Sequence, residues 1–534
     1  MDAAVDPPPE TMALLSDLFA QARYIELLAI TERLLSHFNR SSNLYFIQGR
    51  ARAALNRHHE ALPCYQKAVS LAPEHAEAWC GLGSAQLTVK RPEAARDAFR
   101  QTLTLDPRHG DALSGLGMAL FELQEFEDAE RCFEAVCQSQ PDNARAQTNL
   151  ARLLRRRGDL QAAAARFTRA LELEPGSAEA HNDLGLILLE NGDTDQAAGH
   201  FNSALRLQPD YTTARHNLGL ARYRSGDLNT AAACFRDVLA SMPDSPVTLN
   251  ELGNVLADSG DIPAARACFD RAIAQEPGFV DALWNLAGAA PGVAHACEIL
   301  QRYLAVEPDN EAAAMMLAGL KSTRNGRDEL RPFAGSACEQ HPFLRSFRWV
   351  LELPSPPEVR FDRWSFFDLA ISHCEQGRPF YEFGVWRGRS FSYLVESLGQ
   401  GFGFDSFEGL PEDWHEQSAG SYSARGAVPS IPGGEFVVGR FEDTLPRFFA
   451  VERPMASLVH LDADLYGSTL CALTHARPVI DARTVLVFDE LLMNDAWEQD
   501  EYRALEEFCG DHGWTYEVIA VSFFTKQVAL RLNC

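Results

Sequence analysis

The chain has 534 residues, a net charge of −26 and a mean hydropathy of −0.20. This length predicts more than one domain. The acidic excess is present in both the amino-terminal and the carboxy-terminal part, so no basic stripe remains to follow a phosphate backbone, and we expect no nucleic-acid partner. No apolar run is long enough to cross a bilayer, and the first residues lack the pattern of a secretory signal, so we expect no membrane partner.

Cysteine usage indicates the redox compartment. The 12 cysteines form no C-x-x-C pair and no zinc-like spacing. Four of them recur at one phase of the repeat described next, each directly before an aromatic residue: Cys64, Cys132, Cys234 and Cys268. A recurring phase indicates a recurring packing position, and a reducing cytoplasm fits this use of cysteine.

The first part of the chain repeats with a fixed period. Prolines are spaced 34 residues apart over six consecutive intervals, at positions 73, 107, 141, 175, 209, 243 and 277. A Leu-Gly pair and an alanine followed four residues later by phenylalanine recur at two other phases, as in Leu82-Gly83 and in Ala95 with Phe99. Small residues let two helices approach closely, and the proline stops the second helix. The pattern closely resembles the tetratricopeptide repeat.

This resemblance implies a domain organisation. Residues 1–41 are expected to form a degenerate helical cap, and residues 42–321 a right-handed superhelix of about eight to nine hairpins ending in a capping helix. Residues 322–359, in which the period is lost and proline and glycine are frequent, are predicted to be a linker or docking segment. The remaining residues, 360–534, form a second domain. A protein or peptide partner is expected in the concave face of the array.

A polar ladder suggests how such a partner could be held. Asn149, Asn217 and Asn285 share one phase, before the leucine of the repeat. The ladder resembles the asparagine ladder of O-GlcNAc transferase repeats, and an amide can both donate to and accept from a peptide unit. The alternative is that asparagine is simply common at this position.

The second domain begins with a pattern typical of nucleoside-cofactor binding. A short apolar strand, residues 380–383, leads into a turn with Gly384 and Gly388 and then into a helix over 390–398. Glycines let a ligand approach the backbone, and the helix start offers free N–H groups. The next strand, 402–404, ends in Asp405, an acid that can accept hydrogen bonds from ribose hydroxyls. The G-x-G-x-x-G motif is incomplete, so NAD is disfavoured.

Acidic residues follow two further strand-like runs. Asp462 ends one run and Asp489 ends another 27 residues later, about the length of a strand-helix-strand crossover. Both acids should therefore emerge at the ligand side of a parallel sheet. Carboxylates that converge on one point suit a hard cation such as Mg²⁺. The alternative is that they cap helices or only end strands.

The second domain contains five distinctive blocks: EFGVWRG (382–388), DSFEGLP (405–411), GRFEDTLP (439–446), LDADLYGST (461–469) and FDE (488–490). Taken together, they resemble class I S-adenosylmethionine-dependent methyltransferases, and specifically the macrocin O-methyltransferase family, over roughly residues 360–530. The resemblance implies an α/β Rossmann-like domain that uses S-adenosylmethionine, with a sugar or other hydroxyl-bearing small molecule or glycan as the methyl acceptor.

The resemblance also implies residue roles. Glu382, Gly384 and Gly388 would line the methionine end of the cofactor, Asp405 would hold the ribose, and Phe441 and Glu442 would flank the adenine. Asp462, Asp489 and Glu490 would bind Mg²⁺. The family usually has two aspartates at the last pair, so Glu490 is a departure that weakens the expectation of metal dependence. Asp464 is read as a supporting or helix-capping group.

The base that deprotonates the acceptor is not evident. Related catechol-type enzymes carry a lysine where this chain has Leu465, which leaves His460 or His415 as proton acceptors; each has a simpler reading, as a packed core residue and as a solvated loop residue. Asp462 and His460 are the catalytic residues that the sequence favours. Residues 412–434, rich in serine and glycine, are predicted to be a lid with Trp414 and Tyr422 facing the acceptor.

Two other functions stay open at this stage. The array could be the functional part, with a degenerate methyltransferase-like domain as a scaffold. A repeat-containing glycosyltransferase is a weaker alternative, because the acids lie at the ends of two parallel strands and not in a lone D-x-D loop.

Overall fold

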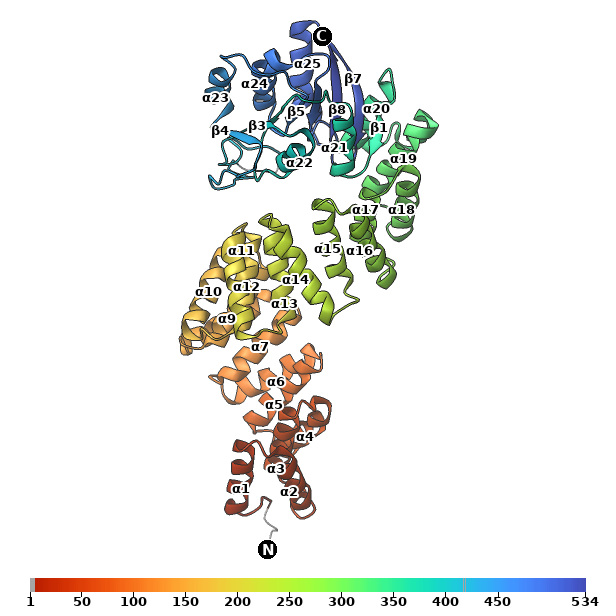
Figure 1. Ribbon diagram of the computed structural model, residues 1–534. Helices are drawn as coiled ribbons and strands as arrows, with labels where there is room; N and C mark the ends of the chain where they lie inside the picture. Colours follow the sequence, from red (N-terminus) through yellow and green to blue (C-terminus); the bar gives the residue numbers. More distant parts are fainter. Residues whose placement is uncertain (1–4, 416, 418) are drawn as a thin grey trace. The chain divides into compact units, whose positions relative to one another are not determined.

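The computed structural model describes residues 5–415, 417 and 419–534. The chain is a series of helical hairpins followed by a mixed α/β region, which confirms the predicted fold class (Figure 1). It divides into two compact units, Met1–Ala221 and Arg222–Cys534, so the last repeats belong to the same unit as the sheet. Over the described ranges, none of the helices combines the length and the apolar character that a membrane span requires.

The first unit consists of helical hairpins. Its helices are α1 (Pro9–Ala20), α2 (Tyr24–Leu35), α3 (Ser42–Ala54), α4 (His58–Leu71), α5 (Ala76–Thr88), α6 (Pro92–Leu105), α7 (Gly110–Glu122), α8 (Phe126–Ser139), α9 (Ala144–Arg156), α10 (Leu160–Leu173), α11 (Ala178–Glu190) and α12 (Thr194–Leu207), and α13 (Thr212–Arg224) crosses into the second unit. The glycine of the Leu-Gly pair leaves room for the repeat's aromatic residue. A Cβ at Gly83 would lie 2.8 Å from the ring of Phe99, which is fully buried. Gly253 and Phe269 repeat this contact.

The second unit continues the array. Its repeat helices are α14 (Leu228–Ser241), α15 (Pro246–Asp258), α16 (Ile262–Gln275), α17 (Val280–Gly288), α18 (Val293–Val306) and α19 (Glu311–Asn325). The expected linker, 322–359, contains the 3₁₀ turns η1 (Arg327–Phe333) and η2 (Ala337–Gln340), helix α20 (Pro342–Glu352) and strand β1 (Glu358–Arg360). In α20, the ring centroid of Phe347 lies 4.0 Å from that of Phe523, and the Phe347 ring fills the space left by Gly319 of α19. The prolines and glycines of this segment therefore end short packed elements and do not mark an extended connection.

One sheet of eight strands organises the rest of the unit. The strands are β1, β2 (Phe380–Phe383), β3 (Gly401–Asp405), β4 (Gly434–Val438), β5 (Leu458–Leu461), β6 (Val485–Phe488), β7 (Thr515–Ser522) and β8 (Val528–Asn533), in the order β1-β7-β8-β6-β5-β2-β3-β4. Among these strands, the two pairings of β8 are antiparallel and the others are parallel. The direction of winding reverses between β2 and β5, and ligands bind at such a switch point in open α/β sheets.

Helices cover both faces of the sheet (Figure 1). They are α21 (Arg363–Ser372), α22 (Arg389–Leu398), α23 (Phe441–Phe448), α24 (Tyr466–Ala476), α25 (Glu501–His512) and the short turns η3 (Arg477–Val479) and η4 (Trp497–Gln499). Adjacent side chains of β2 point to opposite faces: Phe380 packs against Phe391 of α22, whereas Tyr381 packs beside Phe449, which follows α23. Because β2 is buried on both faces, it reads as a continuous apolar run interrupted only by Glu382.

Candidate functional site

The turn after β2 requires glycine at two positions. Gly384 has a φ of +90°, and a Cβ there would lie 1.8 Å from the carbonyl oxygen of Asp462, which follows the neighbouring strand β5. Gly388 has a φ of +73° and is the residue directly before α22. The two glycines therefore allow the chain to pass close to the end of β5 and then to enter a helix.

Asp405 holds this turn to the end of β3. Its Oδ2 accepts hydrogen bonds from the backbone N–H groups of Val385 (2.8 Å) and Trp386 (2.6 Å), and its Oδ1 accepts from the N–H of Phe407 (2.6 Å). A carboxylate offers about four acceptor sites. Asp405 thus keeps capacity for one further hydrogen bond.

A pocket with a volume of about 410 Å³ lies beyond the carboxyl ends of β2, β3, β5 and β6. Seven of the site residues predicted from the sequence line it: Gly384, Asp405, Phe441, Glu442, Asp462, Asp489 and Glu490. Phe441 and Glu442 are the first two residues of helix α23, which begins three residues after the end of β4. The remaining three, Glu382, Gly388 and His460, lie behind the lining.

His460 and Glu382 form a fully buried pair beneath the pocket. His460 Nδ1 lies 2.8 Å from Glu382 Oε1, and the hydroxyl of Ser390 donates to the same oxygen. Burial alone would lower the pKa of His460, but its interactions with Asp489 and Glu382 raise the pKa to about 10. The catalytic role of His460 and the cofactor-binding role of Glu382 stay predictions; both side chains lie outside the lining of the pocket.

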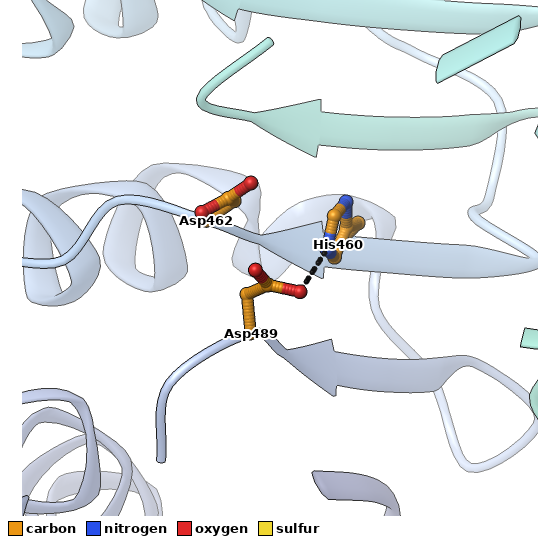
Figure 2. A group of neighbouring side chains, drawn as sticks. All are labelled: His460, Asp462 and Asp489. Atoms are coloured by element: carbon orange, nitrogen blue, oxygen red, sulfur yellow. Dashed lines mark ion pairs between the residues drawn. The ribbon is translucent and has the colours of Figure 1, made fainter. Parts of the chain in front are cut away.

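The acids at the ends of β5 and β6 converge, as Figure 2 shows. His460, Asp462 and Asp489 each offer an atom within 4.8 Å of the others, and His460 Nε2 lies 3.7 Å from Asp489 Oδ1. Asp489 also accepts hydrogen bonds from Arg363 Nη2 (2.7 Å) and Gln527 Nε2 (2.5 Å). Burial alone would raise the pKa of Asp489, but Arg363 and His460 lower it to about 2, so Asp489 is ionised.

Negative charge exceeds positive charge at this point. Burial, together with Asp489 and Asp464, raises the pKa of Asp462 well above its usual value. Burial, Glu490 and Asp489 likewise raise the pKa of Asp464 to about 7. Such mutual repulsion is relieved by a cation, and oxygen ligands suit Mg²⁺. The carboxylate oxygens of Asp462 and Asp489 therefore fit a divalent ion, and His460 offers a ring nitrogen at the same place.

Glu490 belongs to a different network. Its Oε2 accepts hydrogen bonds from Asn494 Nδ2 (2.7 Å) and Lys526 Nζ (3.2 Å). The third metal ligand expected from the sequence is thus engaged with a cation of the protein itself. The longer side chain of glutamate, compared with the aspartate usual in the resembled family, places the carboxylate in reach of Lys526.

The structure adds one residue that the sequence analysis did not select, and it places a second, Asp464, in the lining of the pocket. Arg363, the first residue of α21, lines the pocket and pairs with Asp489, which lies 126 positions later in the chain. Asp464 also lines the pocket and has a φ of +59°. The expected capping role of Asp464 is not observed, because the residue before α24 is Leu465 and no side chain caps this helix. A positive φ is a strained conformation for aspartate and marks Asp464 as a candidate functional residue, but the sequence does not reveal it.

The segment predicted to be a lid contributes one aromatic residue. Tyr422 lines the pocket, and its ring lies 6.3 Å from that of Trp386. Trp414 is buried and lies outside the lining, and His415 Nε2 lies 2.9 Å from Asp500 Oδ2. Residues 416 and 418 of the predicted lid are outside the described residues.

Comparisons with known proteins agree with this architecture. Two family models of the tetratricopeptide repeat match overlapping segments between residues 48 and 290, and the family model of a methyltransferase domain matches residues 381–491. The protein combines tetratricopeptide repeats with a methyltransferase domain. The matched methyltransferase segment runs from β2 to the residue after Glu490, so it contains the glycine turn and the convergent acids. Its presence supports methyl transfer, and the repeats support the binding of a protein partner.

The comparison with curated proteins found no match. Solved structures with some similarity exist, and the identities are low. The crystal structure of the APC/C hetero-tetramer Cut9-Hcn1 is 20% identical with a TM-score of 0.42, covering 52% of this chain and 54% of that chain, so the protein spans about half the length of that relative. PilF of Pseudomonas aeruginosa is 19% identical with a TM-score of 0.36, covering 41% of this chain and 97% of its own. A thermophilic TPR protein of Thermus thermophilus is 21% identical with a TM-score of 0.31, covering 34% of this chain and 98% of its own.

Proposed function

We propose that the protein is an S-adenosylmethionine-dependent O-methyltransferase that acts on a hydroxyl of a sugar or another small acceptor. The observation that supports this most is the pocket itself. It joins the glycine turn after β2 to the acids that follow β5 and β6, at the switch point of a sheet within a methyltransferase domain. The specific resemblance to macrocin O-methyltransferases is part of this proposal.

The pocket offers suitable groups for the adenosine half of the cofactor. Phe441 provides an aromatic face, Glu442 and Asp405 provide carboxylate acceptors, and Gly384 leaves the backbone open to close approach. Bound S-adenosylmethionine supplies an electrophilic methyl group on a sulfonium. The contribution of the protein is then mainly to hold the acceptor oxygen in line with this group and to exclude water.

The acceptor hydroxyl must lose its proton, and we assign the proton acceptor to Asp464. Its carboxylate lines the pocket close to Asp462 and caps no helix, so it is placed to accept the proton of a hydroxyl bound in the pocket. Asp462 keeps the catalytic role expected from the sequence, as an acceptor-facing carboxylate next to this base.

Mg²⁺ dependence belongs to the proposal as well. Asp462 and Asp489 would hold the ion, and Arg363 and His460 would fix the orientation of Asp489. A bound divalent ion would lower the pKa of an acceptor hydroxyl. Glu490 would take part only if it left Lys526 and Asn494.

The repeat array is proposed to hold a protein or peptide partner in its concave face, in a cytoplasmic protein whose cysteines in the described residues are all free. Two residues of the asparagine ladder already bond to neighbouring repeats through their side-chain N–H groups. Asn217 Nδ2 donates to Asn182 Oδ1 (2.9 Å), both buried, and Asn285 Nδ2 donates to Asn250 Oδ1 (3.0 Å). These amides link neighbouring repeats to each other, so their first role is to stabilise the array.

Calorimetric titration tests the proposal. The full chain is titrated with S-adenosylmethionine in the presence of Mg²⁺ and in the presence of a chelator, and separately with a nucleotide sugar. We expect saturable binding of S-adenosylmethionine only. No binding of S-adenosylmethionine would support the alternative of a scaffold with a degenerate domain, and binding of the nucleotide sugar alone would support a glycosyltransferase.

A further inference from the structure

The turn between repeat helices α15 and α16 is seated against the methyltransferase domain. Trp364 Nε1 donates a hydrogen bond to the carbonyl oxygen of Ala257 (2.9 Å), and a Cβ on Gly260 would lie 3.7 Å from the same indole. Ile262 of α16 packs onto the apolar cluster formed by α21, α22 and the sheet. The last repeats therefore contribute to the core of the domain that carries the pocket.

Asp258 lies in the middle of this contact. It ends helix α15, and its Oδ2 accepts a hydrogen bond from the hydroxyl of Tyr223 (3.0 Å). The same oxygen pairs with Arg389 Nη1 (3.3 Å). Arg389 is the first residue of α22, directly after Gly388, so this ion pair attaches the far end of the glycine turn to the repeat array.

The contact at Trp364 also connects the repeat array to Asp489, one of the acids of the pocket. Trp364 follows Arg363, whose guanidinium donates to Asp489 at 2.7 Å. The hydrogen bond from Trp364 to Ala257 thus fixes the start of α21, from which Arg363 reaches into the pocket. One turn of the array consequently supports two walls of the pocket, the glycine turn and the arginine that pairs with Asp489.

We propose that Asp258 is a positioning residue for cofactor binding, through which the repeat array holds the Gly384–Gly388 turn in its binding conformation. Tyr223 orients the carboxylate of Asp258, and the carboxylate orients Arg389. The inference rests on the proposed use of S-adenosylmethionine. It has a consequence for regulation: a partner that shifts α15 on binding must change cofactor affinity, and the cofactor must change the affinity for that partner by the same factor.

The test compares Asp258→Asn with wild type in the full chain, using S-adenosylmethionine titration and steady-state turnover. The matched control is Asp270→Asn, an exposed aspartate of α16. Loss of a partly exposed ion pair and an oriented hydrogen bond is expected to weaken cofactor binding about three- to tenfold. Because Asp258 does not touch the reacting groups, KM for the cofactor should rise while kcat at saturating cofactor stays the same. The control should match wild type in both.

A second background separates positioning from a general loss of stability. In Arg389→Gln the ion pair is already absent, so adding Asp258→Asn should cause little further loss of affinity. If Asp258→Asn does not fold, Tyr223→Phe decides, because it removes only one hydroxyl; it should still weaken cofactor binding. If wild type binds S-adenosylmethionine and the folded variant binds it with the same affinity, the inference is overturned. If wild type does not bind S-adenosylmethionine at all, the proposed function is refuted instead.

Discussion

Replacement of Gly384 by alanine gives the most sharply defined perturbation of the pocket. An alanine with a φ near +90° costs about 1–2 kcal/mol, roughly a factor of 10 in an equilibrium. Its Cβ would also stand 1.8 Å from the carbonyl oxygen of Asp462, although real Cβ atoms essentially never come closer than 3.0 Å. The turn and the end of β5 must therefore separate by an ångström or more, and a misplacement of about 1 Å costs on the order of 100-fold in turnover.

Gly384→Ala should thus weaken S-adenosylmethionine binding at least about tenfold and reduce turnover by about two to three orders of magnitude. Titration calorimetry measures the first effect and product formation the second, with circular dichroism to verify that the fold is retained. Gly467→Ala is the matched control, since this glycine lies in the first turn of α24 and a Cβ there meets nothing within 4 Å. Wild-type affinity in a folded Gly384→Ala protein would show that the turn does not shape the cofactor site.

Three further predictions address the base, the array and one surface acid. Asp464→Asn should lower kcat about 10²- to 10⁴-fold in turnover assays and leave the Kd for S-adenosylmethionine within about twofold; unchanged kcat would exclude Asp464 as the base. Asn217→Ala leaves the buried amide of Asn182 unpaired, so urea unfolding should show a loss of about 1–3 kcal/mol, and equal stability would contradict the structural role. Burial alone would raise the pKa of Asp481, but the guanidinium of Arg378, 2.9 Å from both carboxylate oxygens, lowers it. A lowered pKa stabilises the fold above the unfolded-state value of about 3.9 and ceases to do so as the pH falls through the folded-state value. Asp481→Asn should therefore cost up to about 1 kcal/mol at pH 7 and nothing in strong acid, and a loss that is constant with pH would argue against the ion pair.

Features fixed by local pattern were predictable from the sequence. The 34-residue period identifies the repeats because each hairpin must place its small and aromatic residues at the same phase, as Gly83 and Phe99 do. The convergence of Asp462 and Asp489 was predictable because a crossover of 27 residues returns the chain to the neighbouring parallel strand, here β5 to β6. Strand ends that meet at one edge need no knowledge of side-chain contacts.

Features that depend on tertiary contacts were not predictable. Arg363 reaches Asp489 across 126 positions, and Asp258 reaches Arg389 across 131, so no local spacing reveals either pair. His460 is buried between Glu382 and Asp489. These two carboxylates raise its pKa, although burial alone would lower it. In residues 322–359, likewise, prolines and glycines lie at the ends of short packed elements, and composition alone does not reveal this packing.

We propose that the pocket between the turn after β2 and the acids after β5 and β6 binds the cofactor. A crystal structure of the full chain with S-adenosylhomocysteine would locate the ligand. We expect the adenosine beside Phe441 and Asp405 and the sulfur near Gly384, on the side that faces Asp462. Density for the ligand anywhere else in the molecule, with this pocket empty, would contradict it.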